Sequence, residues 1–306
     1  MSFLRRALGG DGAPEWASFM SGREYREFMT TLERVVGSLG WRATIGEGSI
    51  SVDRGEAGPA EYGLTNLAQL CRTLDRADSQ RAIEAHFAGL HAAEGAQDAV
   101  DELETALPLL KVRVYRSSDL PPEALEGMAT MFLTPDLVGV LVADLPTTVQ
   151  TLGRETVAGW GRPIEELLDL ATDQTVAEAA GLQRDSVDLG DGVTATFLSG
   201  DSFFVASQVL RFDELAGSPP NGALVVLPAR HLLIWYPIRT TATVRAVQRL
   251  LAVANRLYQE GPGPVSPELF WWHGALTLLP SRVSGGSVDF FPPDDFVELL
   301  NSLPGA

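Results

Sequence analysis

The first hundred residues repeat apolar side chains at helical spacing. After Ser21, large apolar residues recur every three or four positions, at Tyr25, Phe28, Met29, Leu32, Val35 and Val36. Ser21 and Glu24 have the spacing of a capping box, so a helix is expected to begin here. Gly37 and Gly40 mark its end. The same periodicity predicts helices over residues 64–74, 79–92 and 97–107.

A short alternating pattern interrupts these helices. Residues 41–45 and 49–52 alternate apolar and polar side chains, and Gly46 and Gly48 lie between the two runs. This pattern predicts a small β-hairpin. Residues 55–59 are expected to form a loop. We therefore interpret residues 1–108 as a mostly helical N-terminal lobe with a small hairpin.

The pattern after Leu109 changes to strands mixed with helices. Residues 138–145 form a continuous apolar run that ends at Pro146, which is typical of a buried strand. Further strands are expected at 109–116, 193–198, 223–227, 232–238, 269–272 and 275–279. Further helices are expected at 154–160, 163–180, 202–215, 241–259 and 294–303. The fold class is therefore α+β, with residues 109–306 forming a mixed β-sheet on which helices pack.

Two stretches of this second region have a similar expected order of elements. One begins at Leu109 and the other at Ala223, and each would run strand, strand, long helix, strand. A duplicated α+β unit is one interpretation. No residue-level repeat accompanies the similarity.

The charge of the chain restricts the classes of partner. The 306 residues carry a formal net charge of −17. Nucleic-acid binders need a basic footprint, and anionic membrane surfaces repel such a chain, so neither partner is expected. A basic protein partner would be attracted.

The cysteine content indicates the compartment. Cys71 is the single cysteine, so no internal disulfide can form, and a reducing cytoplasm is expected. Arg5 and Arg6 are not followed by an apolar stretch, so no secretory signal is expected. No apolar run reaches the length of a transmembrane helix.

Five segments carry a resemblance to a known family. They are YGLTNL at 62–67 with HF at 86–87, VGVLVADLP at 138–146, GDSFFVASQVL at 200–210, LPARHLLI at 227–234, and VSPELFWWHG at 265–274. In these segments the chain resembles the YtpQ-type family of uncharacterised bacterial proteins, a domain of unknown function. The resemblance covers about residues 60–280 and contains no catalytic signature. It implies a bacterial cytoplasmic protein and assigns no activity.

Four residues are candidates for a catalytic site. Asp201 and Ser202 precede a predicted helix, where a serine could be exposed beside backbone N–H groups. Helix capping is the simpler role for both, and the G-x-S-x-G pattern of a nucleophile elbow is absent. Arg230 and His231 lie in the turn between two predicted strands. A backbone-bonded turn histidine is the simpler interpretation of His231.

Other chemistry-bearing residues fit structural roles more simply. Cys71 lies on an apolar helix face, and burial makes a thiol inert. His86 and His91 are five positions apart, so they miss the i, i+4 spacing of a helical metal pair. Asp144 ends an apolar run before a proline, where a turn explains it. No glycine-rich phosphate motif is present. No metal and no cofactor is therefore expected.

Clustered aromatic residues are candidates for a binding surface. Trp271 and Trp272 are consecutive, so a strand must direct them to opposite faces, and His273 follows in a turn. Trp235, with Tyr236, poses the same question in another hairpin. Exposed aromatic side chains dominate binding energy at protein interfaces. The alternative is a sheet that helices cover on both faces.

These observations favour a non-catalytic binding or adaptor protein that engages a protein partner. One version is an immunity-like or chaperone-like partner of a basic protein. The alternative is a hydrolase-type enzyme with a site near Asp201 and His231. A third interpretation, nucleic-acid binding, would depend on the stripe of Arg245, Arg249 and Arg256 on one predicted helix. The sequence leaves the partner and the oligomeric state open.

Overall fold

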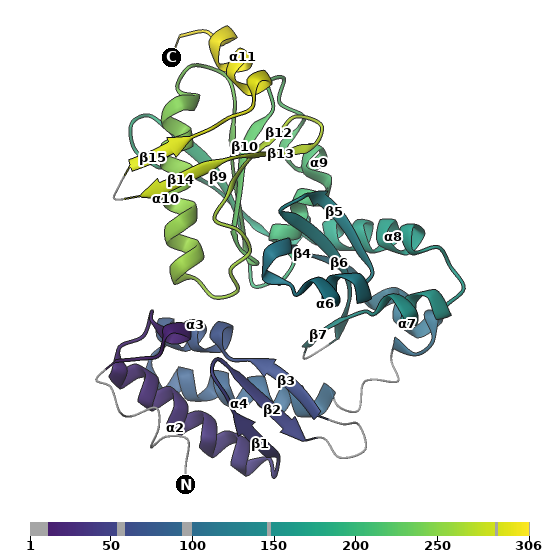
Figure 1. Ribbon diagram of the computed structural model, residues 1–306. Helices are drawn as coiled ribbons and strands as arrows, with labels where there is room; N and C mark the ends of the chain where they lie inside the picture. The colour runs from purple at the N-terminus through teal and green to yellow at the C-terminus, as the bar shows by residue number, and fades with distance from the viewer. Residues whose placement is uncertain (1–11, 54–58, 94–99, 146–147, 285–286, 306) are drawn as a thin grey trace. The chain divides into compact units, whose positions relative to one another are not determined.

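The computed structural model describes residues 12–53, 59–93, 100–145, 148–284 and 287–305 (Figure 1). The chain divides into two compact units. The N-terminal unit comprises Met1–Gln97, Pro146–Thr148 and Gln259–Pro262, and the C-terminal unit comprises Asp98–Leu145, Val149–Tyr258 and Gly263–Ala306. The main division thus falls at residue 98, whereas the sequence pattern changes after residue 108. Both units combine helices with antiparallel sheets, so the α+β class is confirmed.

The N-terminal unit packs helices on a three-stranded sheet. Its strands have the order β1-β2-β3, and both pairings are antiparallel. Its elements are η1 (Glu15–Ala17), α2 (Gly22–Ser38), β1 (Arg42–Ile45), β2 (Ser49–Asp53), β3 (Pro59–Gly63), α3 (Thr65–Thr73) and α4 (Arg76–Ala93).

Local sequence signals determine how this unit begins. The Ser21 hydroxyl accepts a hydrogen bond from the Glu24 amide at 3.3 Å, and the Glu24 carboxylate accepts one from the Ser21 amide at 2.7 Å. The expected capping box is therefore confirmed. The apolar stripe of α2 is buried, and its hydrophobic cluster includes Ile50 and Val52 of β2. The hairpin is also confirmed. The third strand differs from the expectation of a loop over residues 55–59, because β3 begins at Pro59. Residues 54–58 lie outside the described residues.

The C-terminal unit begins with a small sheet. Its strands have the order β4-β6-β5, β7 also pairs with β6, and the central strand β6 is buried on both faces, as its apolar run predicts. The elements are α5 (Leu103–Ala106), η4 (Leu107–Leu109), β4 (Leu110–Arg116), η5 (Ser117–Asp119), α6 (Pro122–Gly127), β5 (Thr130–Thr134), β6 (Leu137–Leu145), β7 (Thr148–Thr151), α7 (Arg154–Gly159), α8 (Ile164–Val176) and η6 (Ala177–Gly181).

Side-chain hydroxyl groups accept hydrogen bonds from the backbone amides on the outer edge of β4. The Val112 amide donates to the Thr175 hydroxyl at 2.8 Å, and the Val114 amide donates to the Ser207 hydroxyl at 3.0 Å. Thr175 lies on α8, and Ser207 lies in a later 3₁₀ helix, η7 (Ala206–Arg211). An unpaired strand edge is a template for aggregation, and this edge is covered instead.

The larger sheet of this unit is covered on both faces. Its strand order is β13-β12-β10-β11-β9-β8. Figure 1 shows α10 and α9 on opposite sides of its strands, in agreement with the two hydrophobic clusters that share them. The elements are β8 (Gln183–Asp188), β9 (Thr194–Ser199), α9 (Phe212–Ala216), β10 (Ala223–Ala229), β11 (Leu232–Pro237), α10 (Thr243–Glu260), β12 (Leu269–Trp272), β13 (Leu276–Leu279), β14 (Ser281–Ser284), β15 (Ser287–Phe290) and α11 (Asp294–Ser302).

Three expectations about this region need correction. The strand pairs are antiparallel rather than mixed, because short turns join most neighbours. The helix expected over 202–215 is the 3₁₀ helix η7 followed by the short α9, and residues 200–205 are a loop. The helix expected over 97–107 is reduced to α5 and η4, and residues 97–99 lie outside the described residues.

The two stretches that suggested a duplication differ in their order of elements. From Leu110 a strand is followed by α6, three strands and two helices, whereas from Ala223 two strands are followed by α10 and four more strands. Among the described helices, none combines the length and apolar character needed to cross a bilayer.

Candidate functional site

The four catalytic candidates meet around the loop of residues 200–205 in the C-terminal unit. Phe204 anchors this loop, because its buried ring packs with Val138, Val140 and Val142 on one face of β6. Beyond the loop, the Ala206 amide donates a hydrogen bond to the Arg230 carbonyl oxygen at 3.0 Å. The loop therefore lies between β6 and the β10–β11 turn that carries Arg230 and His231.

Asp201 and His231 are electrostatic neighbours. Burial lowers the pKa of His231, Arg230 lowers it further, and the negative charge of Asp201 acts in the opposite direction. No hydrogen bond between the two side chains is present in this described part of the chain, and Asp201 is exposed. The imidazole is therefore biased toward its neutral form.

Ser202 has structural partners. Its hydroxyl donates to the Glu178 carboxylate at 2.7 Å and accepts a hydrogen bond from the Phe204 amide at 3.1 Å. The second bond closes a local serine turn. The helix-capping role expected for Asp201 and Ser202 is wrong, because η7 begins only at Ala206 and its N-cap is Val205. His231 is not a hydrogen-bond partner of this hydroxyl. The serine therefore lacks the histidine base that a hydrolase triad would supply.

The Glu178 carboxylate that accepts the hydrogen bond from Ser202 also forms an ion pair. Glu178 also pairs with Lys111, whose ammonium lies 2.9 Å from the carboxylate and donates to the Gln174 carbonyl oxygen at 2.6 Å. Asp144 lies beside this pair. Burial and the charge of Glu178 raise the pKa of Asp144, and Lys111 partly offsets the shift. Lys111, the single lysine of the chain, is thus held among acidic side chains and a carbonyl group.

The tryptophans proposed for a binding surface are buried instead. Trp235, Trp271 and Trp272 are 3%, 7% and 9% exposed. Trp271 packs in the cluster of α10 and α11, whereas Trp235 and Trp272 pack around Phe212 on the other face. The interpretation of these tryptophans as an exposed surface is therefore wrong, because elements cover both faces of the sheet. His273 is exposed and stacks on Trp271 at 5.2 Å between ring centroids.

The remaining sequence candidates have ordinary surroundings. Cys71 is buried, and burial raises the pKa of its thiol. Arg249 pairs with the Asp191 carboxylate, which neutralises part of the proposed arginine stripe, and Arg245 donates to the Asp191 carbonyl oxygen. His86 is exposed, and the side chain of His91 lies outside the described residues. Within the described parts of the chain, no group of three or more histidine, cysteine or acidic side chains is placed to hold a metal ion.

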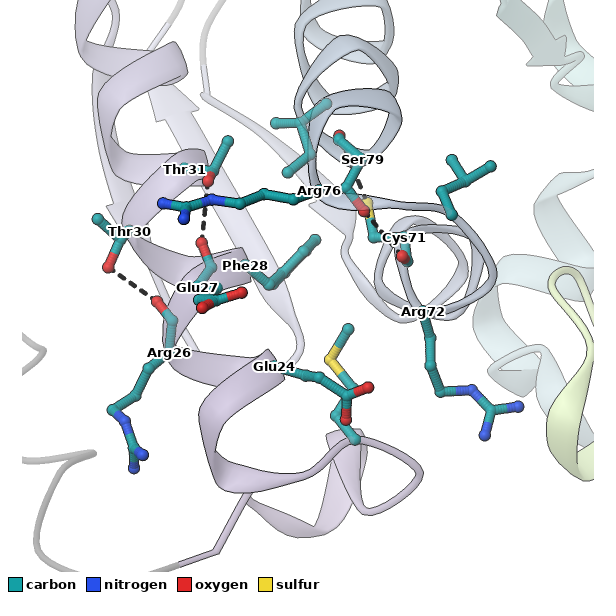
Figure 2. Close-up of a pocket in the computed structure, with 13 residues that line it drawn as sticks. Glu24, Arg26, Glu27, Phe28, Thr30, Thr31, Cys71, Arg72, Arg76 and Ser79 are labelled. Carbon is teal, nitrogen blue, oxygen red and sulfur yellow. Dashed lines mark hydrogen bonds between the residues drawn. The ribbon is translucent and has the colours of Figure 1, made fainter.

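A pocket of about 390 Å³ lies in the N-terminal unit, between α2 and the helices α3 and α4. We call it the helical pocket (Figure 2). Its apolar side chains are Met20, Phe28, Cys71, Leu74 and Ile83, and its polar side chains are Glu24, Arg26, Glu27, Thr30, Thr31, Arg72, Arg76 and Ser79. The volume is in the range of small-molecule and side-chain binding sites.

Opposite charges line the two walls of the helical pocket. Glu24 and Glu27 come from α2 together with Arg26, so this acidic wall is net negative, whereas Arg72 and Arg76 come from α3 and α4. In Figure 2, Arg76 extends from α4 toward Thr31 of α2. Arg72 also lowers the pKa of Glu24, although the hydrogen bonds from Ser21 are the larger cause. The pocket therefore offers an apolar interior between an acidic and a basic wall.

The helical pocket was missed in the sequence because its residues come from three helices. Two of its hydroxyl groups donate to backbone carbonyl oxygens, one within α2 and one from α4 to α3. The Thr31 hydroxyl donates to the Glu27 carbonyl oxygen at 2.9 Å, and the Ser79 hydroxyl donates to the Cys71 carbonyl oxygen at 2.7 Å. The interior hydroxyls are thus satisfied, and the pocket has no activated nucleophile.

A second pocket, of about 410 Å³, lies in the C-terminal unit beside Arg184, Gln208 and Arg211. All three side chains have partners. Gln208 donates to the Thr175 carbonyl oxygen at 2.8 Å, Arg211 pairs with Asp173 at 3.3 Å, and Arg184 donates to the Leu215 carbonyl oxygen. These contacts link neighbouring elements, so the three side chains have few hydrogen-bond donors left for a ligand.

The four catalytic candidates therefore share one loop region, whereas the aromatic candidates belong to the core. The two pockets described above are lined by other side chains. No protein-family model, no curated protein and no solved structure matches this chain.

Proposed function

We propose that the protein is a non-catalytic binding protein that engages a protein partner through the helical pocket. The observation that carries this proposal is the composition of the pocket, whose apolar interior lies between an acidic and a basic wall. Apolar interiors with a few polar groups at the rim are typical of binding sites.

The pocket suits a defined kind of partner segment. An apolar side chain would lie against Phe28 and Ile83. Basic neighbours of that side chain would face Glu24 and Glu27, and acidic neighbours would face Arg76. The net charge of −17 would attract a partner that is basic as a whole.

Two matched variants test this proposal. Thr31→Trp would fill the pocket, whereas Thr73→Trp adds the same bulk to α3 outside it. Both threonines donate their hydroxyls to a carbonyl oxygen of their own helix, so both substitutions remove the same kind of bond. Partners captured from the native host by each variant would be identified by mass spectrometry. Binding of the purified partner would then be measured by calorimetry.

The expected result is one stoichiometric partner with the wild type and with Thr73→Trp. Thr31→Trp should bind that partner at least about tenfold more weakly, which is about 1.4 kcal/mol. Circular dichroism would verify that both variants fold. Equal affinity of the two variants for the purified partner would refute the pocket as the binding site.

A hydrolase remains the second candidate, favoured by the proximity of Asp201 to His231. In that function His231 would act as the base, because a neutral imidazole can accept a proton. The bond from Ser202 to Glu178 opposes the simplest version of this function. The test is turnover of activated ester and phosphoester substrates by the isolated protein. Activity that disappears in His231→Gln and persists in His273→Gln would support the hydrolase.

A further inference from the structure

Two partly buried arginines of the C-terminal unit lack a carboxylate partner, whereas some of its other arginines have one. Arg116 lies 3.2 Å from Glu268, and Arg211 lies 3.3 Å from Asp173. For Arg113 and Arg230, no ion pair and no side-chain hydrogen bond is present within the described residues. The Nε atom of Arg113, like that of Arg116, is buried without a partner. This contrast is unexpected in a chain with 40 acidic and 23 basic residues.

The fold brings these two arginines together around the start of η7. Arg113 precedes Val114, whose amide donates to the Ser207 hydroxyl at 3.0 Å. Ser207 follows Ala206, whose amide donates to the Arg230 carbonyl oxygen at 3.0 Å. The two side chains thus extend from elements that contact the same short segment.

Aromatic rings orient both guanidinium groups. The Arg230 Cζ atom lies 4.1 Å from the centroid of the Phe203 ring, and the Arg113 Cζ atom lies 4.8 Å from that of Tyr115. Cation–π contacts hold a guanidinium group in place without neutralising its charge or using its N–H donors. Phe203 is 39% exposed, so the cluster opens to solvent at this ring.

A glycine maintains the position of Arg230. Gly263 has φ +67°, and a Cβ atom built on it would lie 2.6 Å from the Arg230 Cδ atom. The Arg230 amide also donates to the Gly263 carbonyl oxygen at 2.8 Å. Any larger residue at position 263 would displace the arginine stem.

The two charges repel each other. Burial is the main cause that lowers the pKa of Arg230 to about 10, and the charge of Arg113 lowers it further. Arg230 is still protonated at neutral pH. An unneutralised pair of partly buried cations is unfavourable unless an anion compensates it.

We propose that Arg113 and Arg230 together bind an oxyanion, a carboxylate or phosphate group, whose apolar substituent contacts Phe203. Guanidinium groups form paired hydrogen bonds with both kinds of group. This site is independent of the helical pocket and goes beyond the proposed function. His231 and Asp201 lie at its border, and His231 is biased toward the neutral form, so it adds little charge there.

Calorimetry at pH 7.5 and constant ionic strength tests the proposal. The probes are inorganic phosphate, phenyl phosphate and benzoate. We expect the wild type to bind at least one of them with a Kd below about 1 mM. Arg113→Gln and Arg230→Gln should each weaken binding about tenfold or more, as expected for the loss of a charged hydrogen-bonded pair. Arg239→Gln removes an exposed arginine of the same unit and should leave binding unchanged.

The three probes also distinguish the source of the oxyanion. Tighter binding of phenyl phosphate would indicate a phosphorylated ligand, whereas tighter binding of benzoate would indicate a carboxylate. A gain of phenyl phosphate over inorganic phosphate would reveal the contact with Phe203. No binding of any probe, or equal weakening by Arg239→Gln, would overturn the proposal.

A stability measurement separates a binding role from a structural role. In phosphate-free buffer, the Tm of Arg113→Gln should equal or exceed that of the wild type, because the substitution relieves the repulsion with Arg230. The stabilising shift that the bound probe causes should disappear in the same variant. A Tm that falls by several degrees without any probe would show that Arg113 is structural and would reject the site.

Discussion

Gly222 lies so close to Trp272 that a Cβ atom built on the glycine would be 2.0 Å from the tryptophan carbonyl oxygen. The glycine also has φ +74°, which side chains rarely adopt. Gly222→Ala therefore combines a steric clash with backbone strain. We expect it to lower the free energy of unfolding by about 3 kcal/mol or more, which urea denaturation would measure.

Gly217 provides the control for this prediction. It has φ +72°, and a Cβ atom there would meet nothing within 4 Å. Gly217→Ala should therefore cost only the strain of the left-handed backbone, about 1–2 kcal/mol. If both substitutions cost the same, the close approach to Trp272 contributes nothing.

Ser207 is expected to stabilise the edge of β4. The serine is 1% exposed, and its hydroxyl is the acceptor for the Val114 amide. Ser207→Ala would leave this amide without a partner, at a cost of about 1–3 kcal/mol. Ser302→Ala, which removes an exposed hydroxyl bonded to Leu299 at 2.7 Å, should cost about 0.5 kcal/mol or less. Hydrogen exchange should show faster opening at Val114 in the first variant only, and unchanged protection there would contradict this role.

Elements with local signals could be predicted from the sequence. The capping box of Ser21 and Glu24 and the apolar stripe that follows it lie within one helix, so periodicity was sufficient. The β10–β11 hairpin was recognisable because its two strands are neighbours in sequence. By contrast, Thr175 and Ser207 satisfy an edge strand from 63 and 93 residues away, and no local pattern indicates such partners.

For the candidate site, the sequence indicated the residue types but not their arrangement in space. The residue types of Asp201 and His231 indicate candidate chemistry, but their proximity depends on how the loop packs against β6. The consecutive Trp271 and Trp272 indicate opposite faces of a strand, but a strand pattern does not reveal what covers each face. The pairing of Arg113 with Arg230 was missed for a similar reason, since the two residues are far apart in the chain.

Asp144 should make stability decrease as the pH rises. Its pKa is raised in the folded state by burial and by Glu178, so the folded protein binds a proton more readily than the unfolded chain. Stability therefore falls as the pH rises from the unfolded value through the folded value. Asp144→Asn should be more stable than the wild type at pH 7, and this advantage should shrink as the pH falls toward 4. Urea denaturation at several pH values would measure it.

Asp169→Asn is the control for this pH dependence, because Asp169 is exposed on α8. Its stability relative to the wild type should not follow the same trend. An Asp144→Asn variant that is less stable than the wild type at pH 7 would mean that the attraction to Lys111 outweighs burial and Glu178.

His231 should make the protein sensitive to acid. Its pKa is lowered in the folded state, first by burial and then by Arg230, so the unfolded chain binds a proton that the folded protein resists. The stability is unaffected by this histidine above its unfolded pKa of about 6.5. The stability falls as the pH decreases from about 6.5 toward the lower pKa that His231 has in the folded protein. His231→Gln should therefore lose less stability than the wild type between pH 7.5 and 5, and the exposed His273→Gln should behave like the wild type. Equal losses in the two variants over this pH range would show that Asp201 cancels the effects of burial and Arg230.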